Sequence, residues 1–177
     1  MDDLFKDSSV PLELLRQRAF NLRWATVEPD VIPLTAADPD FAVDTSIREA
    51  LREYAAGGVF SYGPADGLPS FRASAARVQR ERRGVAGCTP ECILPTDSAA
   101  SAMFVAARFA LNPGDEALVF DPVDFLFRAS VEAAGGKAVL CPVDASTGEL
   151  DLDMLAANIG PRTRLLTLCN PHNPVGR

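Results

Sequence analysis

The sequence has a single His and no second pair of closely spaced cysteines, which argues against a metal site. Its cysteines are Cys88, Cys92, Cys141 and Cys169. A structural zinc site needs four ligands, usually in two closely spaced pairs, and only Cys88 and Cys92 form such a pair. We therefore expect no metal, and reduced thiols in a cytoplasmic protein.

Long hydrophobic runs and an excess of positive charge are also missing. No apolar segment approaches the roughly 20 residues that span a bilayer. The acidic N-terminus lacks the hydrophobic core of a signal peptide. The net charge of −7 argues against a nucleic-acid-binding surface. We expect a soluble globular protein with no membrane or nucleic-acid partner.

What the sequence does contain is a regular alternation of strand-like and helix-like segments from Glu91 onward. Apolar runs of strand length occur at 91–96, 116–120, 137–143 and 165–169. Segments expected to be helical lie between them at 97–111, 128–134 and 152–159. This alternation predicts an α/β fold with a mostly parallel sheet. The helix at 97–111 is apolar nearly all round, so we expect it to be buried.

Helices are also expected before this alternation, at 11–20, 45–56 and 70–83. Ser46 and Glu49 have the spacing of a capping box at the start of the second of these helices. Gly57 and Gly58 are expected to end it, and Gly84 follows the third.

Residues 170–177, NPHNPVGR, follow the strand-like run at 165–169. Two Asn-Pro pairs and Gly176 turn the chain sharply out of the sheet. An amide side chain at the end of a buried parallel strand lies where open α/β sheets bind ligands. A proline-rich turn without a ligand is the alternative interpretation.

A second candidate ligand site is the start of the helix expected at 97–111, which begins with small residues. At this start, backbone N–H groups are free to bind an anion, and the side chains there are those of Ser98, Ala99, Ala100 and Ser101. Buried helices also start this way without a ligand, so this pattern alone leaves both interpretations open.

The string NPHNPVG resembles the N-P-H-N-P-T-G signature of the class I/II aminotransferases, which are fold-type-I pyridoxal-phosphate (PLP) enzymes. Further family signals agree in order and spacing over residues 30–177, namely D-P-D-F at 38–41, Y-x4-G at 62–67 and P-G-D at 113–115. The resemblance implies the N-terminal half of a three-layer αβα fold with a mostly parallel sheet. It implies an N-terminal arm and part of the small domain at 1–45, and the first half of the large PLP-binding domain at 46–177.

The resemblance also implies roles for individual residues. By position, Asn173 donates a hydrogen bond to the phenolic oxygen of PLP, and the backbone amides of Ser98 and Ala99 bind its phosphate. Tyr62 reaches the cofactor phosphate of a neighbouring subunit, which implies a homodimer. The backbone amide of Ala37 touches the substrate carboxylate.

Two aspartates depart from the family pattern. Asp97 lies beside the expected phosphate contacts, where its charge is repulsive unless it points away or is paired. Asp124 occupies the position of an aromatic residue that stacks on the PLP ring. Either Phe125 supplies the stacking face after a local shift, or another group stacks there. Phe127 is expected to be a core residue.

The lysines, Lys6 and Lys137, have no counterpart in the family pattern. Lys6 lies in a polar N-terminal segment, and Lys137 opens a strand after two glycines. The resemblance places the lysine that forms the aldimine with PLP beyond Arg177. We therefore expect the 177-residue chain alone to be inactive.

Three functions remain open for the parent protein. The first is a PLP-dependent aminotransferase that moves an amino group between an amino acid and a 2-oxo acid. The second is a PLP-dependent C–S β-lyase, because A-D-P-D-F at 37–41 resembles the segment of cystathionine β-lyase-type enzymes. The third is a non-catalytic domain with the same fold. The sequence does not identify the amino acid substrate.

Overall fold

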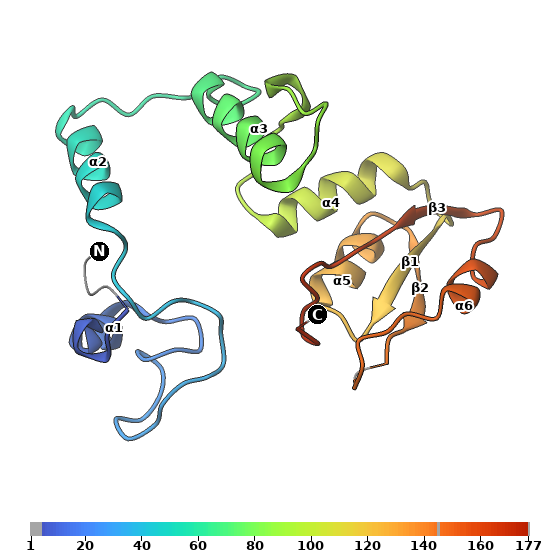
Figure 1. Cartoon of the computed structure of the whole chain (residues 1–177), viewed down its shortest axis with the longest axis horizontal. Helices are drawn as coiled ribbons and strands as arrows, with labels where there is room; N and C mark the ends of the chain where they lie inside the picture. The colour runs from blue at the N-terminus through green and yellow to red at the C-terminus, as the bar shows by residue number, and fades with distance from the viewer. Residues whose placement is uncertain (1–4, 145, 177) are drawn as a thin grey trace. The chain divides into compact units, whose positions relative to one another are not determined.

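The computed structural model describes residues 5–144 and 146–176 and contains two compact units. The N-terminal unit ends at Tyr62, and the α/β unit begins at Gly63 (Figure 1). The N-terminal unit carries α1 (Leu12–Arg18) and α2 (Thr45–Ala56). Within the described ranges, no helix combines the length and hydropathy needed to cross a bilayer.

Three parallel strands form the sheet of the α/β unit. They are β1 (Glu116–Asp121), β2 (Lys137–Pro142) and β3 (Thr163–Leu166), in the order β2-β1-β3. Leu118 of β1 is in register with Val139 on one side and with Leu166 on the other. The expected α/β fold with a parallel sheet is confirmed.

The apolar residues of β1 are buried on both faces of the sheet, as is usual for a central parallel strand. On one face, Val119 packs in a cluster with α4 (Ala99–Ala110) and α5 (Phe125–Ala133). On the other face, Leu150 and Leu155 pack against the cluster around Leu118, and Leu155 belongs to the short helix α6 (Leu152–Ala157). Helices α4 and α5 therefore pack on one face of the sheet, and α6 contributes a single side chain to the other.

Helix α2 occupies the expected residues, but its cap differs from the prediction. The Asp44 side chain accepts a hydrogen bond from the Ser46 N–H at 2.9 Å, so Asp44 is the N-cap. Ser46 lies inside the first turn, and the capping box of Ser46 and Glu49 was wrong. An aspartate satisfies free N–H groups at a helix start as well as a serine does.

The segment 91–96 does not form the expected strand. Pro90–Cys92 is a short 3-10 turn, and the residues after it pair with no strand in the described part of the chain. Pro90 and Pro95 each lack an N–H donor, which weakens any ladder at this place. An apolar pattern alone does not reveal whether a partner strand is present.

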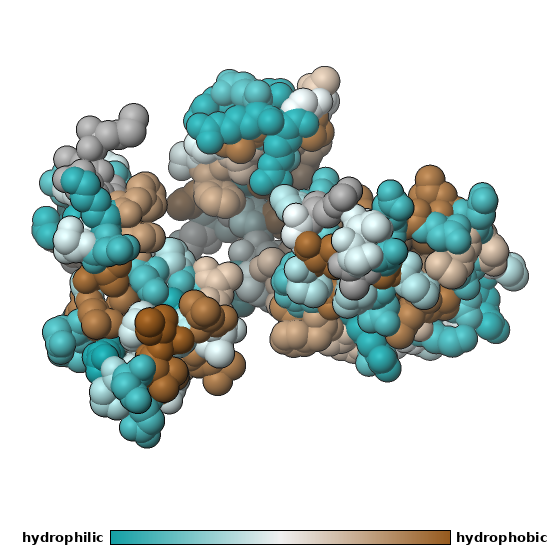
Figure 2. All heavy atoms as spheres, turned by 60° about the horizontal axis from the view of Figure 1, so that its bottom comes forward, coloured by the Kyte–Doolittle hydropathy of each residue, from teal (hydrophilic) through white to brown (hydrophobic). Residues whose placement is uncertain are grey.

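The helix expected at 97–111 forms as α4, but it is not buried on all sides. Ala107 is buried against the sheet, whereas Phe109 is 94% exposed and Phe104 and Val105 also reach the surface. Only one side of α4 packs on the sheet, so its other apolar residues stay uncovered. Hydrophobic residues at the surface also occur in other parts of the chain, as the brown spheres in Figure 2 show.

Other boundaries differ by a few residues. Strand β3 lies at 163–166 rather than 165–169, and α6 ends at Ala157 rather than at Ile159. Helix α5 begins at Phe125 rather than at Arg128, because Asp124 caps it. Helix α3 (Pro69–Arg83) ends at Gly84, whose positive φ of 69° suits a glycine.

Candidate functional site

The candidate site lies where β1 and β3 end, at the carboxyl edge of the parallel sheet. Open α/β sheets bind ligands at this edge. After β3, the Thr167 N–H and hydroxyl both donate to the Leu118 carbonyl, at 3.0 and 3.1 Å. These bonds hold the segment after β3 against the central strand and lead the chain toward Asn173.

Asn173 and Asp124 are joined by two hydrogen bonds. The Asn173 Nδ2 donates to Asp124 Oδ2 at 3.0 Å, and the Asp124 N–H donates to the Asn173 carbonyl at 3.1 Å. The other carboxylate oxygen of Asp124 accepts the Leu126 N–H at 2.9 Å and so caps α5. The Asn173 N–H points to Cys169 Sγ at 3.3 Å. The loop of Asn173 is thereby tied to the start of α5.

The two aromatic residues of α5 have different surroundings. Phe127 packs against the core, as expected, whereas Phe125 is 76% exposed at the first position of the helix. Phe125 lines a cleft of about 200 Å³ together with Asp121, Asp124 and Arg128. Of the two rings, only that of Phe125 is available to a ligand on this side.

Arg128 brings a positive charge to the same cleft. Its Nε donates to Glu132 Oε1 at 2.7 Å, one helical turn further along α5. This pairing with Glu132 raises the pKa of Arg128 above its ordinary value. Arg128 therefore stays cationic, with Glu132 as its partner.

The start of α4 offers free backbone donors. Ser98 is the N-cap, and its hydroxyl accepts the Ser101 N–H at 3.1 Å. The N–H groups of Ala99 and Ala100 have no hydrogen-bond partner among the described residues. Two unpaired N–H groups at the positive end of a 12-residue helix suit an anion.

Asp97, next to these donors, is itself held in place. Hydrogen bonds, first from the Ser101 hydroxyl and then from nearby Ser98 and backbone groups, lower the pKa of the Asp97 carboxyl. The carboxylate is therefore charged and paired with local hydroxyl groups. These donors are neutral and do not cancel the charge of Asp97, so its repulsion of an anion at the start of α4 is weakened only by the solvent to which Asp97 is exposed.

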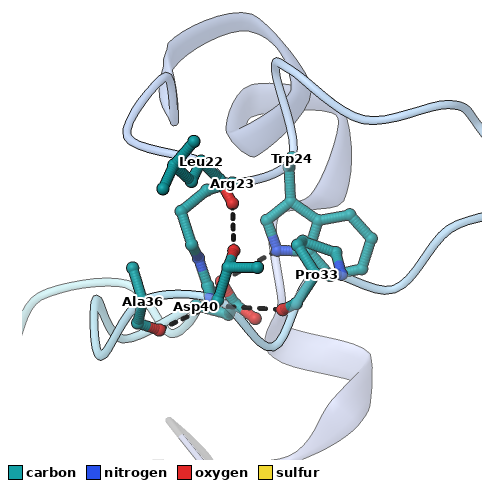
Figure 3. A network of polar contacts seen from close by, with 7 residues as sticks. Leu22, Arg23, Trp24, Pro33, Ala36 and Asp40 are labelled. Carbon is teal, nitrogen blue, oxygen red and sulfur yellow. Dashed lines mark hydrogen bonds and ion pairs between the residues drawn. The ribbon is translucent and has the colours of Figure 1, made fainter.

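In the N-terminal unit, a buried arginine holds the loop at 33–40 (Figure 3), and Ala37 belongs to this loop by sequence. Arg23 is only 5% exposed and donates to the carbonyls of Pro33 and Ala36, at 3.3 and 2.9 Å. Its guanidinium also forms an ion pair with Asp40, whose Oδ1 accepts the Trp24 Nε1–H at 2.9 Å. The conformation of residues 33–40 thus depends on side chains from 23–24.

The structure brings some of the expected site residues together and leaves others apart. Asn173 and Phe125 lie near each other through Asp124, while Ser98 and Ala99 start a different helix of the same unit. Ala37 and the fully exposed Tyr62 belong to the N-terminal unit. Lys137 pairs with Glu116 at 3.3 Å, where β1 and β2 begin, which is the opposite edge of the sheet.

The sequence marks Asp124 as a departure from the family pattern, but it predicts neither the bond of Asp124 to Asn173 nor the role of Arg23. Asp124 precedes the first apolar residue of α5, and an acidic residue at that place is a recognised helix-start signal. Its hydrogen bond to Asn173 joins positions 49 residues apart and has no local signal. Arg23 likewise acts over 10 to 17 positions.

Comparison with known proteins places these residues in a family. The profile described as "Aminotransferase class I and II" matches residues 29–177. A probable aspartate/prephenate aminotransferase of Thermus aquaticus is 34% identical over 160 residues, which are 90% of this chain and 41% of the relative. An arginine–pyruvate transaminase of Pseudomonas aeruginosa is 32% identical over 83% of this chain and 37% of its own length. The chain thus spans about two fifths of these curated relatives.

Solved structures of aminotransferases resemble this chain in fold. The aspartate aminotransferase of Thermus thermophilus with maleate superimposes with a TM-score of 0.75 at 32% identity, over 80% of this chain and 37% of that one. Cystalysin of Treponema denticola, at 24% identity, shares the fold with a TM-score of 0.79 over 92% of this chain and 43% of its own. With the profile matched over most of its length, the chain belongs to the aminotransferase class I and II family.

Proposed function

We propose that this chain is the N-terminal part of a PLP-dependent aminotransferase that moves an amino group between an amino acid and a 2-oxo acid. The observation that carries the proposal is the side-chain amide of Asn173, held at the carboxyl edge of the sheet by Asp124. Family membership supports the same activity, since relatives at 30–34% identity are named as aminotransferases.

The residues present fit PLP by the chemistry of their donors. We assign the phosphate to the backbone amides of Ser98 and Ala99 at the start of α4, where the unpaired N–H of Ala100 offers a further donor. Asn173 keeps one N–H for the phenolic oxygen, because Asp124 takes only one of the two. The exposed ring of Phe125 offers an apolar face to the cofactor ring. When bound, PLP supplies an electron sink that stabilises a carbanion.

Three further assignments follow the family resemblance. We assign the backbone amide of Ala37 to the substrate carboxylate, and Tyr62 to the phosphate bound by a second subunit of a cytoplasmic homodimer. The aldimine lysine is assigned to the part of the enzyme beyond Arg177, since Lys137 is paired with Glu116 at the far edge of the sheet. We also propose that residues 1–45 form the N-terminal arm and part of the small domain of the whole protein. Residues 46–177 then form the first half of its large PLP-binding domain.

The decisive experiment uses the whole protein that carries this sequence. One portion is incubated with PLP, reduced with borohydride and weighed by mass spectrometry, and amino transfer from aspartate and from arginine to 2-oxo acids is assayed in a second portion that is not reduced. We expect one covalent pyridoxyl group and turnover that depends on a 2-oxo acid. A protein that takes up no PLP would contradict the proposal and favour a non-catalytic domain.

The same preparation tests the lyase alternative. The segment 37–41 that resembles C–S lyases is the loop fixed by Arg23, so it is an ordered part of the N-terminal unit. Release of pyruvate and ammonia from cystathionine, with no need for a 2-oxo acid, would assign the protein to the lyases instead.

Asn173→Ala tests the residue that carries the proposal. Loss of a hydrogen bond to a charged oxygen should weaken PLP binding roughly tenfold to a hundredfold, measured by fluorescence titration. Asn112→Ala is the matched control, because Asn112 precedes β1 at the opposite edge of the sheet and bonds only Asp115 there. If both variants bind PLP as tightly as the wild type does, Asn173 does not contact the cofactor.

A further inference from the structure

We propose that Asp124 is a positioning residue that orients the Asn173 amide and places a negative charge beside the phenolic oxygen of PLP. The inference rests on the proposed function and deepens it. It concerns a position where the family resemblance led us to expect an aromatic ring.

The geometry of the pair leaves little freedom to either side chain. Hydrogen bonds fix both the backbone and the side chain of Asp124. Its N–H donates to the Asn173 carbonyl, its carbonyl accepts the Phe127 N–H, and its carboxylate accepts from the Leu126 N–H and from Asn173 Nδ2. The carboxylate therefore has one oxygen on the helix cap and the other on the amide. Any movement of Asp124 toward one partner stretches the bond to the other.

The acceptor-only character of a carboxylate determines which way the Asn173 amide faces. Because a carboxylate cannot donate, the NH2 group of Asn173 must point to Asp124, and Oδ1 must point away. One N–H remains on the same nitrogen for a second acceptor. A phenolic oxygen that accepts this N–H therefore lies one amide group away from the Asp124 carboxylate.

The surrounding charges do not cancel that of Asp124. Arg128 on α5 lines the same cleft but is paired with Glu132, and Asp121 at the end of β1 adds another carboxylate. From the loop after β3, Cys169 accepts the Asn173 N–H. Also in this loop, both ring nitrogens of His172 are buried without a partner among the described residues.

An anion close to the phenolic oxygen favours the protonated form of the bound cofactor. The pH at which the visible absorbance of the holoenzyme changes should therefore lie higher with Asp124 than without its charge. A single charge at hydrogen-bonding range shifts such a midpoint by about one pH unit. A residue that merely supported the loop would not move this midpoint.

The test is a spectroscopic pH titration of the whole protein loaded with PLP. Asp124→Asn removes the charge and can still cap α5, since asparagine is as good an N-cap as aspartate. Its carboxamide also lets the Asn173 amide turn over, because it can donate as well as accept. Asp153→Asn, on the exposed surface of α6, is the control with the same change of charge.

We expect Asp124→Asn to lower the midpoint by about one pH unit and Asp153→Asn to leave it unchanged. Asp124→Ser, which keeps the cap but cannot reach Asn173, should lower the midpoint as Asp124→Asn does, and it guards against a folding defect peculiar to one variant. Unchanged midpoints in both Asp124 variants, with PLP bound, would overturn the inference and leave the proposed function standing. Failure of the wild type to bind PLP would overturn both.

A second readout needs no cofactor. In the whole protein without PLP, the side-chain NH2 resonances of Asn173 should differ between the wild type and Asp124→Asn, because the group that accepts their hydrogen bond changes. Identical resonances in the two proteins would show that the amide does not face the carboxylate, which would also overturn the inference.

Discussion

The two units of this chain are stabilised by different physical means. In the α/β unit, the interior is apolar and centred on β1, where residues 117–120 are all buried. Among the described residues of the N-terminal unit, the buried ones are Arg23 and Pro33. The guanidinium of Arg23 takes the place that a hydrophobic core has in the other unit.

This difference determines how each unit should respond to change. Apolar burial is non-directional and scales with area, so a loss in the core of the α/β unit is felt by the whole unit. Hydrogen bonds and ion pairs are directional, so the Arg23 network specifies one conformation of the loop around Ala37. Damage to that network should be local.

The largest effect should follow Leu118→Ala in the core of the α/β unit. Leu118 is 1% exposed and packs with Phe120 and Cys141. The lost burial and the cavity should reduce the free energy of unfolding by about 2–5 kcal/mol, measured by urea denaturation. A loss near zero would mean that apolar burial is not what stabilises this unit.

A smaller and more local effect is expected for Arg23→Ala. The change leaves the Asp40 carboxylate without its cation and two loop carbonyls without a donor, at a cost of about 1–3 kcal/mol. Hydrogen exchange should accelerate over 33–40 while the strands of the α/β unit keep their protection. Arg23→Lys is the control that keeps the charge but not the planar fork. If hydrogen exchange became faster throughout both units, the effect of Arg23 would not be local to the N-terminal unit.

We expect the contribution of Glu116 to stability to depend on pH. Glu116 is the first residue of β1, and its carboxylate forms ion pairs with Lys137 and Arg162. Hydrogen bonds from Arg162 and then from Lys137 lower the pKa of Glu116 below its ordinary value of 4.5. The folded state therefore gains stability that is present above 4.5 and is lost as the pH falls through the lower folded-state pKa.

The measurement is the urea midpoint of the wild type and of Glu116→Gln at several pH values. The wild type should be the more stable protein well above 4.5, and the difference should shrink in acid. Glu13→Gln, on the exposed side of α1 in the other unit, should show no such trend. A constant difference at all pH values would exclude the charge of Glu116 as the cause.

The smallest effect is expected for Phe109→Ser on α4. Because Phe109 is 94% exposed, its replacement should change the stability of the isolated chain by less than about 0.5 kcal/mol. A large loss of stability, or a change in sedimentation, would show that this face of α4 is covered in solution.

The sequence predicted the elements whose pattern depends on burial alone. The strand expected at 116–120 and the helix expected at 45–56 form at almost the same residues. In both segments the spacing of the apolar residues identifies the type of element. The run at 91–96 has the same apolar character but no partner in the described sheet, and a strand exists only through its neighbours. Local pattern cannot supply that neighbour.

The candidate site was predictable in part. The positions of Asn173 and of the α4 start follow from turn and helix-start chemistry together with the family resemblance. The bond between Asn173 and Asp124 does not, because it depends on how two loops from different strands meet. The burial of Arg23 was not predicted for the same reason, since its partners lie 10 to 17 positions away in another loop.

The bond between Asp124 and Asn173 also bears on how sequences of this kind can be recombined. The partners are 49 positions apart and follow different strands, so a crossover between them separates a donor from its acceptor. An aromatic residue at position 124 has no carboxylate to accept this hydrogen bond. The Asn173 amide would then need a different acceptor. We therefore expect the two positions to vary together among relatives, and hybrid genes should take both from one parent.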